Sequence, residues 1–282
     1  MLAFGWLAGG CKAISTPLGS SQGQQTGTPK VLAVESFLAD IAQNVAGDRI
    51  RVMTLMPLGI DPHGFEPTPQ DIGRIADANI LLVNGAGYEE WLQKVLDNAG
   101  GKREVIVASA GLASRTARAG ELSSSEATDA TQGAGDPHFW LDPTKVVTYV
   151  ENVRDGLIQS DPAGKDTYTA NAATYIAKLK ELDKSIADQI QQVPEARRLL
   201  VTNHESLGYF ADRYGLRVVG AIIPSISTNA SPSAVEMAHL VETIRSVAAP
   251  AVFLEANANP QLAEQIAQET GIKVVTNLYT ET

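Results

Sequence analysis

From Lys30 onward, short apolar runs alternate with segments in which apolar residues recur every three or four positions. The short runs predict buried strands, and the three-to-four spacing predicts amphipathic helices. The first half of the chain has predicted strands at 31–34, 50–56, 80–83 and 104–108 and predicted helices at 37–45, 69–76, 88–99 and 143–158. Apolar strands that alternate with helices indicate a parallel sheet covered on both faces.

The longest helical pattern, 165–193, divides the chain into two such units. A helix of this length spans about 40 Å, enough to run along a whole molecule. After it come predicted strands at 199–202, 217–223, 251–255 and 272–278 and predicted helices at 207–214, 231–247 and 260–270. We therefore predict an α/β protein with an N-terminal lobe (30–162), a linking helix (163–194) and a C-terminal lobe (195–282).

The first 29 residues do not follow this pattern. Residues 1–10 are apolar, end in small residues and stop at Cys11, the only cysteine. They resemble the end of a lipoprotein signal peptide, in which Cys11 would be lipidated and would anchor the protein to a membrane outside the cytoplasm. No basic region precedes the run, so an incidental cysteine is the alternative. Residues 12–29 have the composition of a flexible tether, and 119–134 that of an exposed loop.

The formal net charge of −10 and the pI of about 4.9 exclude nucleic acid as a favoured partner, because phosphate binding needs a basic surface. A single cysteine cannot form an intramolecular disulfide, and thiolate metal sites need several cysteines. Any metal ion must therefore be held by His, Asp and Glu.

Three of the four histidines lie at predicted edges of the sheets. His63 follows a strand in Asp-Pro-His-Gly-Phe-Glu-Pro, His138 precedes a helix in Asp-Pro-His-Phe-Trp-Leu-Asp-Pro, and His204 ends a strand. Ligands of open α/β sheets bind beyond the carboxyl ends of the strands, and a proline fixes the backbone before each of the first two imidazoles. Neutral imidazole suits Zn²⁺ and, together with carboxylates, Mn²⁺. His239 falls within a helix and is predicted to be structural.

A fourth donor is needed, and three glutamates near strand ends are candidates: Glu205, Glu255 and Glu281. Two aspartates, Asp61 and Asp142, are candidates for groups that orient ligands or cap helices, with capping favoured for Asp142 because Pro143 follows it.

From Lys30 to its end, the chain resembles the zinc- and manganese-binding lipoproteins of bacterial ABC importers. The resemblance rests on the two Asp-Pro-His motifs, on His-Glu-Ser-Leu-Gly-Tyr-Phe at 204–210 and on Asn-Leu-Tyr-Thr-Glu at 277–281. It implies two Rossmann-like lobes joined by a rigid helix, with one ion between them. It further implies that His63 and His138 bind from the N-terminal lobe, and His204 and Glu281 from the C-terminal lobe.

The same resemblance implies a monomer that delivers its ion to a permease in the membrane and is not an enzyme. The chain departs from the family at Glu281, where aspartate is usual, and at Thr282, where the family continues with another helix, so the C-terminal lobe is expected to be truncated. The terminal carboxylate of Thr282 is then an alternative donor. Segment 119–134 lacks the histidines of many zinc-type members. His204 favours Zn²⁺, because manganese-type members more often have a carboxylate there.

Three other functions are compatible with parts of the sequence. A metal-dependent hydrolase could use the same histidines with Glu205 as general base, but it would need an open metal position. A surface adhesin would not exclude metal capture. A sugar- or amino-acid-binding protein would leave the histidines unexplained, and the aromatic content of 6% is low for such clefts.

Overall fold

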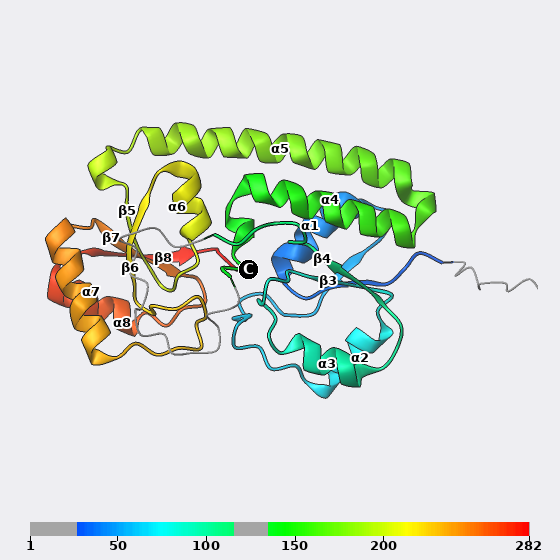
Figure 1. The fold of residues 1–282 in the computed structure, drawn as a ribbon, viewed down its shortest axis with the longest axis horizontal. Coiled ribbons are helices and arrows are strands. Elements are labelled where there is room, and N and C mark those ends of the chain that lie inside the picture. The colour runs from blue at the N-terminus through cyan, green and yellow to red at the C-terminus, as the bar shows by residue number, and fades with distance from the viewer. Residues whose placement is uncertain (1–26, 116–134, 282) are drawn as a thin grey trace, which may run out of the picture.

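Two α/β lobes lie side by side beneath one long helix (Figure 1). The computed structural model describes residues 27–115 and 135–281, so the predictions for Cys11, for segment 119–134 and for Thr282 lie outside the described residues. Both sheets are entirely parallel and have equivalent strand orders, β2-β1-β3-β4 and β6-β5-β7-β8. The predicted fold class is confirmed, while the exact domain boundaries remain a prediction.

The N-terminal sheet is covered on both faces. Its strands are β1 (Val31–Ala33), β2 (Val52–Thr54), β3 (Ile80–Val83) and β4 (Glu104–Val107), and its helices are α1 (Ser36–Ala46), α2 (Pro69–Asp77), α3 (Leu92–Ala99) and α4 (Pro143–Ser160). Val31 and Ile80 pack toward α1 and α4, whereas Leu32 and Leu81 pack with residues of α2 and α3. This alternation follows from the two-residue period of a strand and explains why the two central strands, β1 and β3, are apolar throughout.

The C-terminal sheet repeats the design. It consists of β5 (Leu199–Thr202), β6 (Arg217–Ala221), β7 (Ala251–Glu255) and β8 (Lys273–Leu278), with α6 (Gly208–Tyr214), α7 (Ala234–Val247) and α8 (Gln261–Thr270). Val201 and Val252 pack with α7 and α8, and Leu200 packs with Ala211 of α6.

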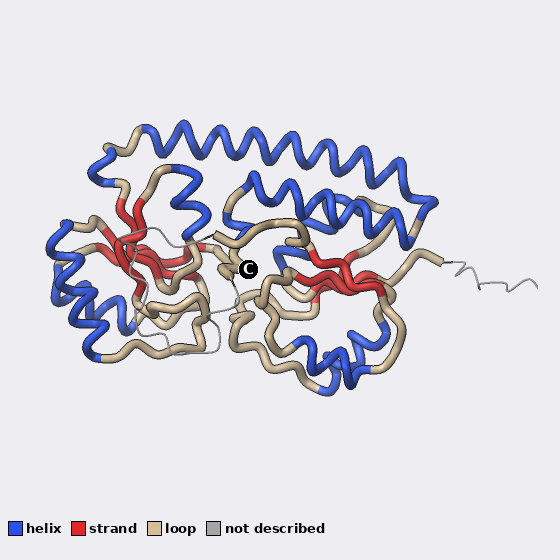
Figure 2. The backbone as a smooth tube through the Cα atoms, in the orientation of Figure 1, coloured by secondary structure: helices blue, strands red, loops and turns tan. Residues whose placement is uncertain are grey.

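Helix α5 (Lys165–Gln191) runs along both lobes (Figure 2). It contributes Tyr168 and Leu179 to the N-terminal core. On the C-terminal lobe, Arg213 of α6 donates a hydrogen bond to Asp183 at 2.8 Å. No helix among the described residues is long and apolar enough to cross a membrane.

Element boundaries differ from the sequence prediction at several helix starts and in two strands, since β2 and β6 are shorter than the predicted 50–56 and 217–223. The helix predicted at 88–99 begins at Leu92, because the carboxylate of Glu89 accepts hydrogen bonds from the backbone N–H groups of Asn84 and Gly85 and holds the segment as a loop. The predicted cap at Asp142 is confirmed, since its side chain accepts a hydrogen bond from Thr144 N at 2.9 Å.

Candidate metal centre

Four side chains predicted as ligands meet between the lobes. His63 lies in the loop between β2 and α2, and His138 lies just before the short 3₁₀ turn Phe139–Leu141 that leads into α4. His204 follows β5, and Glu281 follows β8. One donor atom from each of the four lies within 4.8 Å of the others. Each lobe thus supplies two donors.

The donor atoms have the spacing of a small coordination shell. His138 Nε2 lies 3.4 Å from His63 Nε2 and 3.2 Å from His204 Nε2. Glu281 Oε1 lies 3.5 Å from the Nε2 atoms of His63 and His204 and 3.9 Å from that of His138. An ion about 2.0–2.1 Å from four tetrahedral donors separates them by about 3.4 Å, which is close to these separations of 3.2–3.9 Å.

Carboxylates lie next to the Nδ1 atoms of two of the imidazoles, on the side of the ring opposite the clustered Nε2 atoms. His138 Nδ1 lies 2.9 Å from Asp136 Oδ1, and that oxygen also accepts a hydrogen bond from the His138 backbone N–H at 3.0 Å. His204 Nδ1 lies 2.9 Å from Glu255 Oε1. A carboxylate at Nδ1 keeps the proton there and leaves the Nε2 lone pair free for a metal. Glu255, one candidate for the fourth donor, therefore serves as a partner of His204.

The buried site favours neutral imidazole at His138 and ionised carboxylate at Glu281. Burial lowers the pKa of His138 and outweighs the opposing effect of Asp136. Burial would lower the pKa of His204 as well, but the contact with Glu255 outweighs it and raises that pKa. For Glu281, burial acts to raise the pKa, and the three histidines overcome this and lower it.

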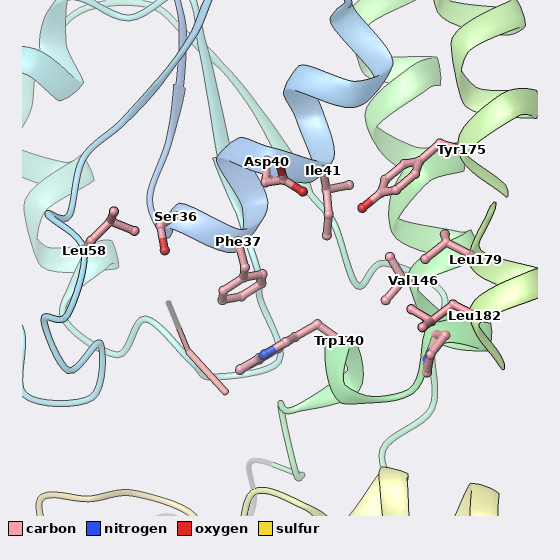
Figure 3. A pocket seen from close by; sticks show the side chains of 11 residues that line it. Ser36, Phe37, Asp40, Ile41, Leu58, Trp140, Val146, Tyr175, Leu179 and Leu182 are labelled. Carbon is pink, nitrogen blue, oxygen red and sulfur yellow. The ribbon is translucent and has the colours of Figure 1, made fainter. Parts of the chain in front are cut away.

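Glu281 is held in place by aromatic side chains of the N-terminal lobe. The hydroxyl of Tyr88 donates a hydrogen bond to Glu281 Oε1 at 3.3 Å. Trp140 Nε1 donates to the carbonyl of Thr280 at 2.6 Å, and the ring of Trp140 stacks on Phe37 in an apolar pocket (Figure 3). Oε2 of Glu281 is buried with no hydrogen-bond partner among the described residues. A cation among the donors would instead contact Oε1, the oxygen nearest to the three imidazoles, and would balance the charge of this buried carboxylate.

The remaining candidates lie elsewhere. Glu205 is not among the four clustered side chains, and His239 is exposed on α7, as expected of a structural histidine. Asp61 orients the His63 loop, because Oδ1 accepts the His63 backbone N–H at 2.9 Å. The sequence analysis did not single out Asp136, although it lies two residues before His138 as Asp61 lies two before His63. It also missed Tyr88, for which the pattern contains no signal.

A second buried acidic group lies behind the site, at the end of β1. Glu35 is 1% exposed, and neither of its carboxyl oxygens has a hydrogen-bond donor among the described residues. Burial, followed by the charge of neighbouring Glu89, raises the pKa of Glu35 well above its usual value. The two backbone hydrogen bonds that Glu89 accepts favour its ionised form, so the proton of this pair lies on Glu35. Nothing in the hydrophobic pattern signals this pair.

Replacing Glu35 by glutamine is expected to stabilise the protein at alkaline pH. The unfolded-state pKa is about 4.3 and the folded-state pKa is higher, so the wild type loses stability as pH rises above about 4.3. Glutamine keeps the shape and a donor but does not titrate. Melting temperatures at pH 5 and pH 8 should show the advantage of Glu35→Gln growing with pH, to on the order of 1 kcal/mol. Exposed Glu90→Gln is the control, and parallel pH profiles for Glu35→Gln and wild type would contradict the prediction.

Together the fold and the site define a two-lobed solute-binding protein with a buried three-histidine, one-carboxylate cluster between its lobes. Residues 31–282 match the family described as zinc-uptake complex component A, periplasmic, and the chain belongs to that family.

Relatives of known role agree with this assignment. The chain is 33% identical over 275 residues to the manganese-binding lipoprotein MntA of Halalkalibacterium halodurans, covering 98% of this chain and 85% of the relative. It is 30% identical to the manganese ABC transporter substrate-binding lipoprotein PsaA of Streptococcus anginosus, covering 89% and 80%. The structure of the Mn-bound periplasmic metal binding protein from Candidatus Liberibacter asiaticus superposes with a TM-score of 0.76 at 28% identity, covering 90% of each chain.

These findings confirm the predicted family and the extracytoplasmic location. The chain belongs with the metal-binding, substrate-binding proteins of ABC transporters, which act with a membrane permease. Such proteins are transport components and not enzymes, so the hydrolase interpretation is set aside.

Proposed function

We propose that this chain captures one Zn²⁺ ion with His63, His138, His204 and Glu281 and delivers it to its permease, with Mn²⁺ as the alternative cargo. The observation that carries the proposal is the approach of four donor atoms, two from each lobe, to within 4.8 Å of one another. Four protein donors leave no open coordination position, which suits capture and transfer rather than catalysis.

Zinc is preferred on the chemistry of the donors. Three imidazoles and one carboxylate suit Zn²⁺, and sites of nitrogen and oxygen donors generally bind Zn²⁺ more tightly than Mn²⁺. The family description names zinc, whereas the two relatives above are named for manganese. The ion that the site binds most tightly can differ from the ion that the protein carries in the cell, because metal availability also decides which ion is loaded.

Competitive titration separates the two ions. Protein stripped with a chelator and then dialysed against either metal should retain one ion per chain, measured by mass spectrometry of the metal content. Added Zn²⁺ should displace bound Mn²⁺, with an affinity ratio above about tenfold. Preferential retention of Mn²⁺ from an equimolar mixture would contradict the zinc assignment while leaving the site intact.

The remaining parts of the proposal concern attachment and assembly. Lipidation at Cys11 would hold the protein at the membrane, and residues 12–29 would let the lobes reach the permease. We expect a monomer, because a single chain supplies all four donors.

A further inference from the structure

Segment 225–230 of the C-terminal lobe reaches across to the loop that carries His63. It follows β6 and contains no helix or strand. Thr228 Oγ1 donates a hydrogen bond to Asp61 Oδ2 at 2.6 Å, and Asn229 Nδ2 donates to the carbonyl oxygen of His63 at 2.8 Å. Residues 225–230, which we call the strap, therefore bind the His63 loop through two hydrogen bonds.

Both ends of the strap connect to proposed ligands. At its base, the carbonyl of Ser225 accepts a hydrogen bond at 2.9 Å from the backbone N–H of Glu205, the residue after His204. At its tip, Thr228 shares Asp61 with the His63 backbone, because the other oxygen of Asp61 accepts the His63 N–H at 2.9 Å. One polar segment thus links a ligand of each lobe.

Polar turns shape the strap internally. The hydroxyl of Ser225 accepts the backbone N–H of Ser227 at 3.1 Å, and the hydroxyl of Ser227 accepts that of Asn229 at 3.2 Å. Such turns define a conformation without burying apolar surface, so the contacts with the other lobe can open at small cost.

His63 is the proposed ligand nearest to solvent. Its side chain is 6% exposed, whereas those of His138 and His204 are 0% exposed. His63 also lines a hollow of about 230 Å³ between the lobes, together with Gly87 and Glu90 from one side and Ser227 and Asn229 from the other. The hollow beside His63 is therefore the candidate passage between solvent and the cluster.

We propose that Thr228 and Asn229 are positioning residues for His63, and that their two hydrogen bonds across the lobes set the rates at which the ion enters and leaves. This rests on the proposed function, since it takes the four-residue cluster as the binding site. The ion passes through the hollow beside Glu90, and each passage requires the strap to release the His63 loop.

The expected size of the effect follows from the two bonds. A hydrogen bond contributes about 0.5–1.5 kcal/mol net, so losing both changes the opening equilibrium by about 5- to 150-fold. Since the strap closes the passage in both directions, its loss raises the association rate as well as the dissociation rate. The equilibrium affinity then changes less than either rate.

Stopped-flow exchange of Zn²⁺ tests the proposal on the double variant Thr228→Val, Asn229→Ala. Dissociation is followed with excess EDTA, and association with a zinc-sensitive dye as competitor. We expect dissociation to accelerate about tenfold and association severalfold, while cooperative thermal unfolding of the metal-free variant shows that it is still folded. The single variant Thr228→Ser keeps the hydroxyl, so its association and dissociation rates should lie close to those of the wild-type protein. Asn259→Ala, which removes an exposed asparagine from another loop of the same lobe, should leave both rates unchanged.

Each outcome has one meaning. An unchanged dissociation rate in the double variant would overturn the inference, and so would faster dissociation with unchanged association, since that would show a weakened bound state and no gate. Failure of the wild-type protein to bind one Zn²⁺ would instead refute the proposed function, which the equilibrium titration detects before any rate is measured.

Discussion

Replacing His138 by alanine is expected to weaken Zn²⁺ binding by about 100- to 1,000-fold. His138 is fully buried, and its Nε2 lies within 3.9 Å of the donor atoms of the three other ligands. Four-donor zinc sites in small domains bind with about 10–16 kcal/mol, or roughly 3–4 kcal/mol per donor. Loss of one donor therefore corresponds to two or three powers of ten in the dissociation constant. Competition with a chelating dye measures it.

A matched histidine provides the control. His239 is exposed on α7, away from the cluster, so His239→Ala should bind Zn²⁺ like the wild type. Melting temperatures of the metal-free proteins show whether His138→Ala is still folded. If a folded His138→Ala variant kept the wild-type affinity, the ion would be bound somewhere other than between the lobes.

Glu281 is expected to show the next largest effect, because it is the only negatively charged donor in the cluster. Glu281→Gln keeps the side-chain shape but removes the charge that three imidazoles surround, and we expect about 100-fold weaker binding. Wild-type protein at 1,000 times its dissociation constant gains about 4 kcal/mol of stability from the ion. The metal-dependent rise in melting temperature should therefore shrink markedly in this variant.

The variant Glu281→Asp separates the effect of the negative charge on Zn²⁺ affinity from the effect of side-chain length. Aspartate restores the charge with one methylene less, so we expect affinity within about tenfold of the wild type. Equal affinity of Glu281→Gln and wild type would contradict the role of Glu281 and would point to another carboxylate as the fourth donor.

Much of the fold could be predicted because the apolar pattern specifies it locally. The four-residue run Ile80–Val83 is a buried strand over that same range, since both of its faces are covered and each of its residues must be apolar. Boundaries were wrong where a side chain competed with the helix. Glu89 binds the N–H groups of Asn84 and Gly85, and nothing in the spacing of residues 88–99 reveals that contact.

The candidate site was predictable from the sequence where rare residues fall at strand ends, and less so where its contacts connect distant segments. His63, His138 and His204 stood out because histidine is scarce in this chain and three of four lie at sheet edges. The pairing of Glu255 with His204 could not be read from the sequence, because it depends on β5 and β7 being neighbours in the sheet.

Contacts between the lobes were the hardest to foresee. Thr228 meets Asp61, and Tyr88 meets Glu281, only because the long helix brings the carboxyl ends of the two sheets together. Thr228 and Tyr88 are ordinary residues for their local surroundings, so no pattern along the chain distinguishes them.

The most direct test of the proposed metal site is anomalous X-ray diffraction from crystals of the zinc-loaded protein, recorded on both sides of the zinc absorption edge. We predict one strong peak between the lobes, about 2.0–2.2 Å from Nε2 of His63, His138 and His204 and from a carboxylate oxygen of Glu281. A peak at another place, or none between the lobes in a crystal that contains one zinc per chain, would contradict the proposed site.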